Sequence, residues 1–162
     1  MYGFIGSISL HSDKKVSLYC EPHKGNPKLI QNETSWGEFQ VKRLTLDKFA
    51  NDKVFYESED TVIVAEGVIY NFLRLEEKYG IKNRGVLLEK MFKELSLTDF
   101  ADQLNGMFAL VIYDKKAEKL NLIGDAISYK SIWYVQSNDC LLFSTDIDWL
   151  YRTFSQYESL KV

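Results

Sequence analysis

The opening of the chain combines a strand pattern with a group that could do chemistry. Residues 1–10 read Met-Tyr-Gly-Phe-Ile-Gly-Ser-Ile-Ser-Leu and run into the polar stretch 11–14, which predicts a strand followed by a turn. Gly3 and Gly6 remove side chains at positions where another backbone is expected to approach closely. A strand that begins at residue 2 would hold the terminal amine in folded structure, and an amine with a pKa of about 8 can act as a base near neutral pH.

The cysteines and histidines give no comparable signal. Cys20 and Cys140 lie far apart and form no Cys-x-x-Cys pair, and His11 and His23 lack the spacing of metal ligands. The sequence therefore favours two buried, reduced cysteines over a disulfide or a zinc site, and no metal site is predicted.

Composition limits the function classes. The chain has 162 residues, of which 46% are hydrophobic and 14% aromatic, so one domain with its own core is expected over residues 1–162. A net charge of -3 argues against nucleic acid as the main partner. No apolar run approaches the ~20 residues of a membrane span, and no pattern of a signal peptide opens the chain. A cytoplasmic protein is predicted.

Hydrophobic periodicity predicts strands, then helices, then strands, then a helix. Residues 21–35 read as a loop, Gly80 as the end of the first helix and Thr98 as the N-cap of the third. Strands are expected at 15–20, 37–46, 54–56, 61–65, 107–113, 119–123, 132–135 and 141–144, and helices at 69–79, 86–95, 98–104 and from about 145. Because the central strands are apolar on both faces, we expect an α+β fold of two stacked antiparallel sheets with helices outside.

Several stretches resemble one family. The most specific are Glu-Gly-Val-Ile-Tyr-Asn at 66–71 and Leu-Asn-Gly-Met-Phe-Ala at 104–109; weaker ones are 1–6, 43–46 and 142–147, with Asp125, Lys130 and Tyr134. Together they resemble the N-terminal class II glutamine amidotransferase domain of asparagine synthetase and its relatives, most clearly over residues 1–150. The resemblance implies the four-layer αββα sandwich of N-terminal-nucleophile hydrolases. It also implies glutamine hydrolysis by an N-terminal Cys, with its own α-amine as the base.

The family's site residues are only partly present. Tyr2 stands at the nucleophile's position, and a phenol of pKa about 10 on a bulky ring does not replace a thiol of about 8.5. Glu66 replaces the Asn that donates to the oxyanion, and Asn83 replaces the Asp that binds the substrate amine. Arg43, for the substrate carboxylate, and Gly67 are kept. No catalytic residue is expected, and the predicted ligand-binding residues are Arg43 and Gly67.

Structural roles are the alternatives for the same residues. Arg43 could be a salt-bridged strand residue, Tyr2 a packed aromatic side chain, and Asp125 with Lys130 a turn pair. We prefer Glu66 as a cap of the following helix to a catalytic role. The tryptophans are expected in the core or an interface: Trp36, Trp133 and Trp149.

The resemblance implies a degenerate, non-hydrolysing domain that supports an ATP-dependent amide-forming enzyme of the asparagine synthetase type, similar to lasso-peptide cyclases or β-lactam synthetases. No Ser-x-Gly-x-Asp-Ser pyrophosphate loop occurs. No cofactor is therefore expected in this chain, and ATP and Mg²⁺ are expected in a synthetase domain, in the same or a separate chain. One alternative is a stand-alone binding module for a small amino acid or carboxylate, and another is an active hydrolase with altered chemistry. A homodimer is a further option.

Overall fold

The computed structural model describes residues 3–10, 16–22, 29–46 and 54–159. The chain divides into two compact units, one made of residues 1–50 with 132–162 and the other of residues 51–131. Each unit contains one antiparallel sheet and at least one helix, so the α+β class and the two antiparallel sheets are confirmed. That residues 1–162 form a single domain stays a prediction.

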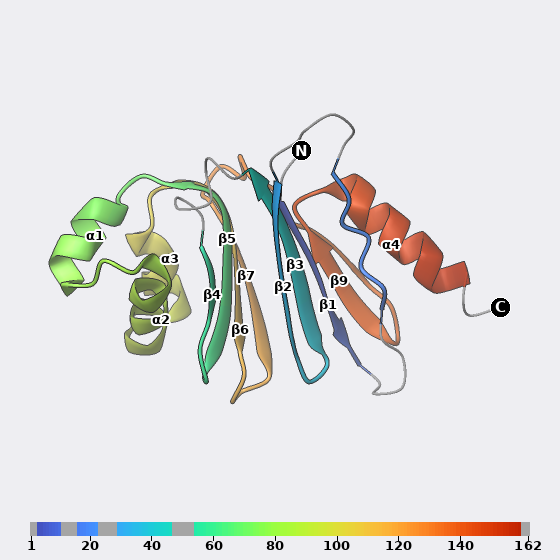
Figure 1. Ribbon diagram of the computed structural model, residues 1–162. Coiled ribbons are helices and arrows are strands. Elements are labelled where there is room, and N and C mark those ends of the chain that lie inside the picture. The colour runs from blue at the N-terminus through green and yellow to red at the C-terminus, as the bar shows by residue number, and fades with distance from the viewer. Residues whose placement is uncertain (1–2, 11–15, 23–28, 47–53, 160–162) are drawn as a thin grey trace. The chain divides into compact units, whose positions relative to one another are not determined.

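The first unit is built on a five-stranded sheet with the order β2-β3-β1-β9-β8. Its elements are β1 (Gly3–Ser9), β2 (Leu29–Trp36), β3 (Phe39–Leu46), β8 (Trp133–Gln136), β9 (Cys140–Ser144) and α4 (Ile147–Ser159). The opening strand β1 lies in the middle, antiparallel to both β3 and β9. Helix α4 runs along one face of the sheet (Figure 1), where Trp149 and Leu150 pack with Ile5 and Leu142.

Two local contacts explain why β1 can occupy the centre of its sheet. The ring of Phe143 covers Gly6, and a Cβ atom at Gly6 would lie 2.2 Å from that ring and 2.7 Å from the carbonyl oxygen of Gln40. The backbone N–H of Phe4 donates to Thr145 Oγ1 at 3.0 Å. The predicted close approach of another backbone is thus found at Gly6, through the carbonyl oxygen of Gln40, although the nearest neighbour there is the Phe143 ring. At Gly3 the prediction is wrong, because a Cβ atom there would meet the side chain of Thr145.

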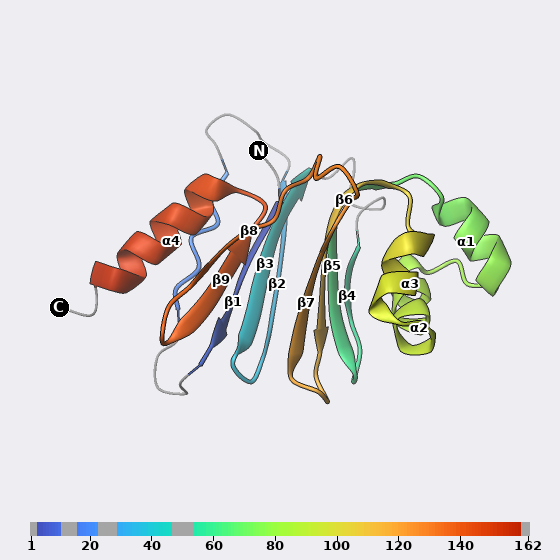
Figure 2. The same ribbon diagram turned by 180° about the vertical axis from the view of Figure 1, so that it is seen from behind.

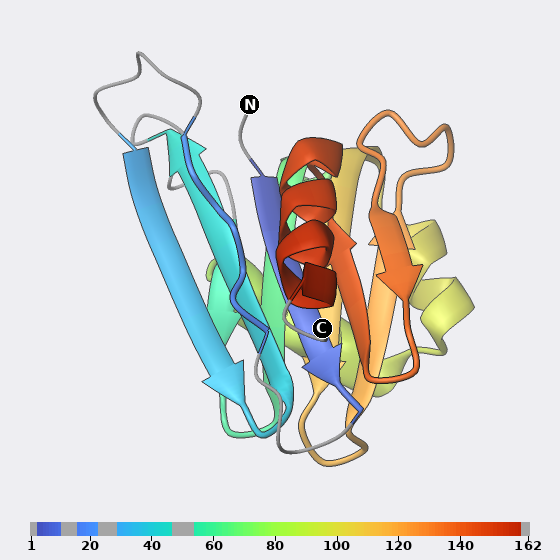
Figure 3. The same ribbon diagram turned by 90° about the vertical axis from the view of Figure 1, so that its right-hand side faces the viewer.

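Two sequence predictions in this unit are wrong. The described part of the predicted strand 15–20 is an extended segment without a strand ladder: Tyr19 N–H donates to Thr153 Oγ1 of α4 at 2.9 Å. We call residues 16–22 the strap, because it crosses the unit beside α4 (Figure 3). The predicted loop 21–35 contains all of β2 except its last residue, and β2 pairs with β3 along its whole length. Its polar residues hid it, since an edge strand need not alternate with apolar residues.

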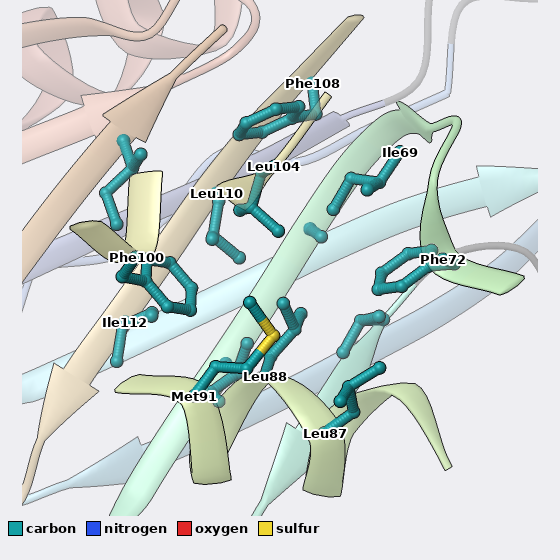
Figure 4. Packing of buried hydrophobic residues seen from close by; sticks show 14 of the residues in the cluster. Ile69, Phe72, Leu87, Leu88, Met91, Phe100, Leu104, Phe108, Leu110 and Ile112 are labelled. Carbon is teal, nitrogen blue, oxygen red and sulfur yellow. The ribbon is translucent and has the colours of Figure 1, made fainter. Parts of the chain in front are cut away.

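The second unit has a four-stranded sheet with the order β4-β5-β6-β7. Its elements are β4 (Phe55–Glu57), β5 (Thr61–Ile69), β6 (Gly106–Asp114), β7 (Lys119–Gly124), α1 (Phe72–Tyr79), α2 (Arg84–Glu94) and α3 (Leu97–Gln103). Figure 4 shows the core, in which helix side chains such as Leu88, Met91 and Phe100 point toward Leu110 and Ile112 of β6. The predicted strands 107–113 and 119–123 correspond to β6 and β7, and 132–135 and 141–144 to β8 and β9. Each pair is antiparallel and consecutive in the chain.

Helix limits in the second unit follow local capping chemistry. Gly80 ends α1 in the left-handed region with φ 68°, as predicted. The N-cap of α3 is Ser96 and not Thr98, because Ser96 Oγ accepts the N–H of Asp99 at 3.1 Å. Among the described residues, no helix is both long and apolar enough to span a bilayer.

The tryptophans and cysteines differ in their surroundings. Trp149 is fully buried in the core, whereas Trp36 and Trp133 are about half exposed, so a core position is wrong for those two and an interface position stays a prediction. Both cysteines are free; Cys140 is buried and Cys20 half-buried. Burial raises the pKa of the Cys20 thiol to about 12, so this thiol is protonated near neutral pH and is a poor nucleophile.

Candidate functional site

The two most specific sequence stretches, 66–71 and 104–109, form one structure. They lie on neighbouring strands of the second unit, with Gly67 opposite Phe108 and Ile69 opposite Gly106. Beyond the strands, Tyr70 N–H donates to the carbonyl oxygen of Asn105 at 2.7 Å. The stretches that carry the resemblance therefore meet at the end of β5 and the start of β6.

Two polar side chains hold this end of the sheet together. Asn71 bridges the two turns: its Nδ2 donates to Gln103 O at 2.8 Å and its Oδ1 accepts the N–H of Asn105 at 3.0 Å. Asp125 accepts four backbone N–H groups, at 3.0 to 3.1 Å, from Phe108, Ile127, Tyr129 and Lys130. Burial alone would raise the pKa of Asp125, but these hydrogen bonds outweigh it and lower the pKa. The turn role of Asp125 and Lys130 is confirmed, with Lys130 taking part through its backbone.

Glu66 lies inside β5, opposite Ala109, and only 1% of the residue is exposed. Ala65 and Ile69 belong to the core beneath the helices, so strand alternation places Glu66 on the other face of the sheet. Helix α1 begins at Phe72 with Asn71 as its N-cap residue. The prediction that Glu66 caps this helix is therefore wrong, because five residues of strand and turn separate Glu66 from the helix.

Gly67 is required by the backbone. Its φ is 96°, a conformation that side chains disfavour, and a Cβ atom there would lie 2.1 Å from the carbonyl oxygen of Met107 on β6. The close approach of β5 and β6 at this point explains the glycine without any ligand.

Arg43 lies on β3 of the first unit and is almost fully buried, with 3% exposed. Its Nη2 donates to Oδ1 of Asn32, directly opposite on β2, at 2.7 Å. Thr45 follows on the same face, is fully buried, and has no hydrogen-bond partner for Oγ1 among the described residues. A buried guanidinium and a buried hydroxyl are thus two residues apart on one strand face, a donor set that suits a carboxylate.

The family resemblance identified Arg43 as a candidate site residue, but sequence reasoning missed Asn32 and Thr45. Asn32 stood in a predicted loop, and its role depends on the β2–β3 register. Thr45 gave no signal, because threonine is an ordinary strand residue.

Asn83 is the N-cap of α2, where its Oδ1 accepts the N–H of Val86 at 3.1 Å. It lies in the second unit with Glu66 and Gly67, whereas Arg43 belongs to the first. Tyr2 lies outside the described residues. The described chain contains no group of three or more His, Cys, Asp and Glu side chains that could bind a metal ion.

The capping role of Asn83 gives a stability prediction. Asn83→Ala removes the acceptor for Val86 N–H and is expected to lower the free energy of unfolding by about 1 kcal/mol. Asn83→Asp keeps an acceptor at the helix N-terminus and should leave stability within about 0.5 kcal/mol of the wild type. Urea unfolding of both variants measures the difference, and equal losses in the two would contradict the cap.

Comparison with known protein families identifies the family of this chain. The family model described as a glutamine amidotransferase domain matches residues 41–152. This covers both paired stretches at the β5–β6 end, Arg43 and α2. The chain belongs to the glutamine amidotransferase domain family.

Individual proteins with similar sequences include asparagine synthetases. A putative glutamine-hydrolysing asparagine synthetase 2 of Methanocaldococcus jannaschii is 29% identical over 105 residues, which are 59% of this chain and 20% of that protein. The glutamine-hydrolysing asparagine synthetase 2 of Bacillus subtilis is 25% identical over 135 residues, 75% of this chain and 18% of that protein. The chain thus spans about a fifth of the length of these relatives.

A solved structure shows the same fold. The glutamine phosphoribosylpyrophosphate amidotransferase of B. subtilis, complexed with ADP and GMP, superposes with a TM-score of 0.56 at 11% identity, over 72% of this chain and 30% of that one. The amidotransferase fold, of the N-terminal-nucleophile hydrolase type predicted from the sequence, is confirmed. The chain is an amidotransferase-like domain. Glu66 lies on β5, at the start of the stretch 66–71, one of the two that most specifically resemble the family.

Proposed function

We propose that this domain does not hydrolyse glutamine and instead supports an ATP-dependent, amide-forming enzyme of the asparagine synthetase type as a structural or docking module. The observation that carries the proposal is the position of Glu66. In the family resemblance this residue replaces an Asn donor to the oxyanion. Glu66 is a buried strand residue and lacks the side-chain N–H₂ with which an Asn would donate to the oxyanion.

Two further substitutions point the same way. The sequence has Tyr2 where the nucleophilic Cys would stand, and the phenol is a much weaker nucleophile near neutral pH because its pKa is about 10. Asn83 carries no charge for a substrate amine, and its side-chain oxygen already accepts a helix N–H. Nucleophile, oxyanion donor and amine site are thus all altered, while Gly67 has a reason to remain that is independent of glutamine.

A glutaminase assay tests the proposal. The purified chain is incubated with glutamine, and ammonia and glutamate are measured beside a glutamine-hydrolysing relative. We expect release at background, since loss of one oxyanion donor alone costs about 10²–10³ in rate. Hydrolysis by the wild type that disappears in Tyr2→Phe would overturn the proposal in favour of an active hydrolase with altered chemistry. An intact mass on the same sample shows whether Met1 is present.

The proposed partner is a synthetase domain, in the same or a separate chain, that holds ATP and Mg²⁺. The matched relatives are asparagine synthetases of about five times the matched length, which supports such a partner. Lasso-peptide cyclases and β-lactam synthetases, which use an amine other than ammonia, are the proposed models for the reaction. A cytoplasmic location fits this role.

One observation favours a second candidate, a module that binds a small amino acid or carboxylate. Buried Arg43 shares one strand face with the hydroxyl of Thr45, which has no partner among the described residues. Calorimetry with glutamine, glutamate and asparagine tests this candidate. Heat that is lost in Arg43→Met and weakened in Thr45→Val would support it, and no heat with any of the three would remove it.

A further inference from the structure

The outer edge of β8 differs from the other sheet edges in its lack of charge. Edge strands with exposed backbone groups pair readily with other chains, and charged side chains are the usual protection. The edge strands β2, β4 and β7 carry Glu33, Glu57 and Lys119. Strand β8 reads Trp-Tyr-Val-Gln, with neither charge nor proline. No described strand pairs with its outer side (Figure 2).

The register fixes which backbone groups point outward. At the β8–β9 turn, Ser137 N–H donates to Cys140 O at 2.9 Å, so the backbone of residue 137 faces β9. Because facing alternates along a strand, Val135 and Trp133 also face β9. The N–H and C=O groups of Tyr134 and Gln136 therefore point away from the sheet, available to a further strand.

An apolar surface adjoins this edge. Arg152 stacks over Tyr19 at 5.2 Å, and Trp149 Nε1 donates to Glu21 O at 3.2 Å, so the strap lies on one flank of α4. At 100° per residue, Ile147 and Tyr151 lie on the opposite flank, and α4 packs against β8 and β9. Ile147, Tyr151 and Trp133 are 58%, 70% and 47% exposed.

We propose that the β8 edge pairs with β8 of a second copy of this chain, antiparallel and about a two-fold axis at Tyr134. A two-fold axis normal to the sheet leaves each side chain on its own face of the sheet. Residues that lie opposite each other must then share a face, which requires one residue to lie opposite its own symmetry mate. Tyr134 can take this place, because its backbone N–H and C=O groups point outward and would bond those of the second copy. Trp133 then faces Val135 of the second copy. Ile147 and Tyr151 of both copies cover the seam beside it.

Charge favours a second copy as the occupant. The chain is acidic, with a net charge of -3, which opposes most self-contacts, but this edge brings no like charges together. Lys130 lies three residues before β8 and Asp139 three residues after it. Antiparallel alignment therefore brings opposite charges toward each other at both ends of the seam.

The test is the molar mass of the purified chain across concentration, by light scattering after size exclusion and by sedimentation equilibrium. We expect a reversible dimer of twice 18.9 kDa. Tyr134→Pro removes an outward N–H, and Tyr151→Lys places like charges across the seam; each should weaken dimerisation about tenfold or more, which is 1.4 kcal/mol. Circular dichroism confirms that both variants stay folded.

A matched control is Leu73→Lys, because Leu73 is 69% exposed on α1 of the other unit. It should dimerise as the wild type does. A wild type that stays monomeric at several hundred micromolar overturns the pairing and leaves the edge to a strand of a different protein. Unchanged dimerisation in both Tyr134→Pro and Tyr151→Lys would also overturn the proposed pairing, because the contact would then lie elsewhere.

Discussion

Gly67→Ala is expected to destabilise the domain by about 3 kcal/mol or more. A left-handed φ for a residue with a side chain costs roughly 1–3 kcal/mol. At Gly67 the added Cβ would also lie 2.1 Å from Met107 O and 2.9 Å from Phe108 Cα. Because both neighbours are backbone atoms of the paired strand β6, the clash is relieved only if β5 and β6 separate, and overpacking of that kind costs about 1–3 kcal/mol more.

Gly80→Ala is the matched control for the strained φ. Gly80 also has a left-handed φ, 68°, but a Cβ atom there would meet no described residue beyond its immediate chain neighbours within 4 Å. Its substitution should cost about 1 kcal/mol. For a chain of this size each kcal/mol lowers Tm by about 2–4 °C, so thermal unfolding separates the two variants. Equal Tm losses would contradict the close approach of the strands.

The result bears on function as well as stability. Gly67 is one of two site residues that the family resemblance marks as kept, and a retained residue invites the inference of a retained ligand site. If the fold itself requires glycine, its presence carries no information about glutamine. The evidence for ligand binding then rests on Arg43 with its neighbour Thr45.

Sequence patterns predicted the elements in which apolar side chains mark the buried positions. Strand β6 and the helices α1 and α2 carry runs of apolar residues at the period of their structure, and they were placed within a few residues of their ends. Strand β2 was not predicted, because an edge strand buries few side chains and so shows no clear apolar pattern. The strap was predicted as a strand and is not one. Val16 and Leu18 alternate with polar residues as in a strand, but the backbone N–H of Tyr19 donates to a side chain of α4.

The site was predictable to a smaller extent for a related reason. A single residue has no period, so Glu66 before a glycine and a helix could be interpreted as a cap, although it belongs to a strand that runs on to Ile69. Arg43 could be identified through the family resemblance, but its partner Asn32 required the register of a strand that the sequence did not reveal. Pairings between distant segments decide the environment of each of these residues.

Glu89 is expected to be the most sensitive polar residue of the second unit. It is a buried residue of α2 whose carboxylate accepts hydrogen bonds from Tyr56 Oη at 2.9 Å and Ser58 Oγ at 2.6 Å. Thr61 Oγ1 donates at 3.2 Å, and Lys93 Nζ lies at 3.0 Å. One carboxylate thus ties α2 to β4, to β5 and to the turn between them.

Glu89→Ala should lower the free energy of unfolding by about 3–5 kcal/mol, because it leaves buried donors and a lysine without their shared acceptor. Glu94→Ala is the matched control on the same helix: Glu94 pairs with the exposed Lys90, and loss of a surface pair costs at most about 1 kcal/mol. Urea unfolding of both variants gives the difference. Losses within about 0.5 kcal/mol of each other would contradict a central role for Glu89.

The same network predicts how stability depends on pH. Hydrogen bonds from Lys116 and Lys93 lower the pKa of Asp60 to about 2. Burial alone would raise the pKa of Glu89, but hydrogen bonds from Ser58, Lys93 and Tyr56 outweigh it and lower the pKa. Carboxylates with a lowered folded pKa contribute stability above their unfolded pKa of about 4 and lose it as pH falls further. The wild type should therefore lose stability below about pH 4, and Glu89→Gln should lose less over that interval because one of the two carboxylates is gone. Parallel pH profiles for the two proteins would show that folding does not lower the pKa of Glu89.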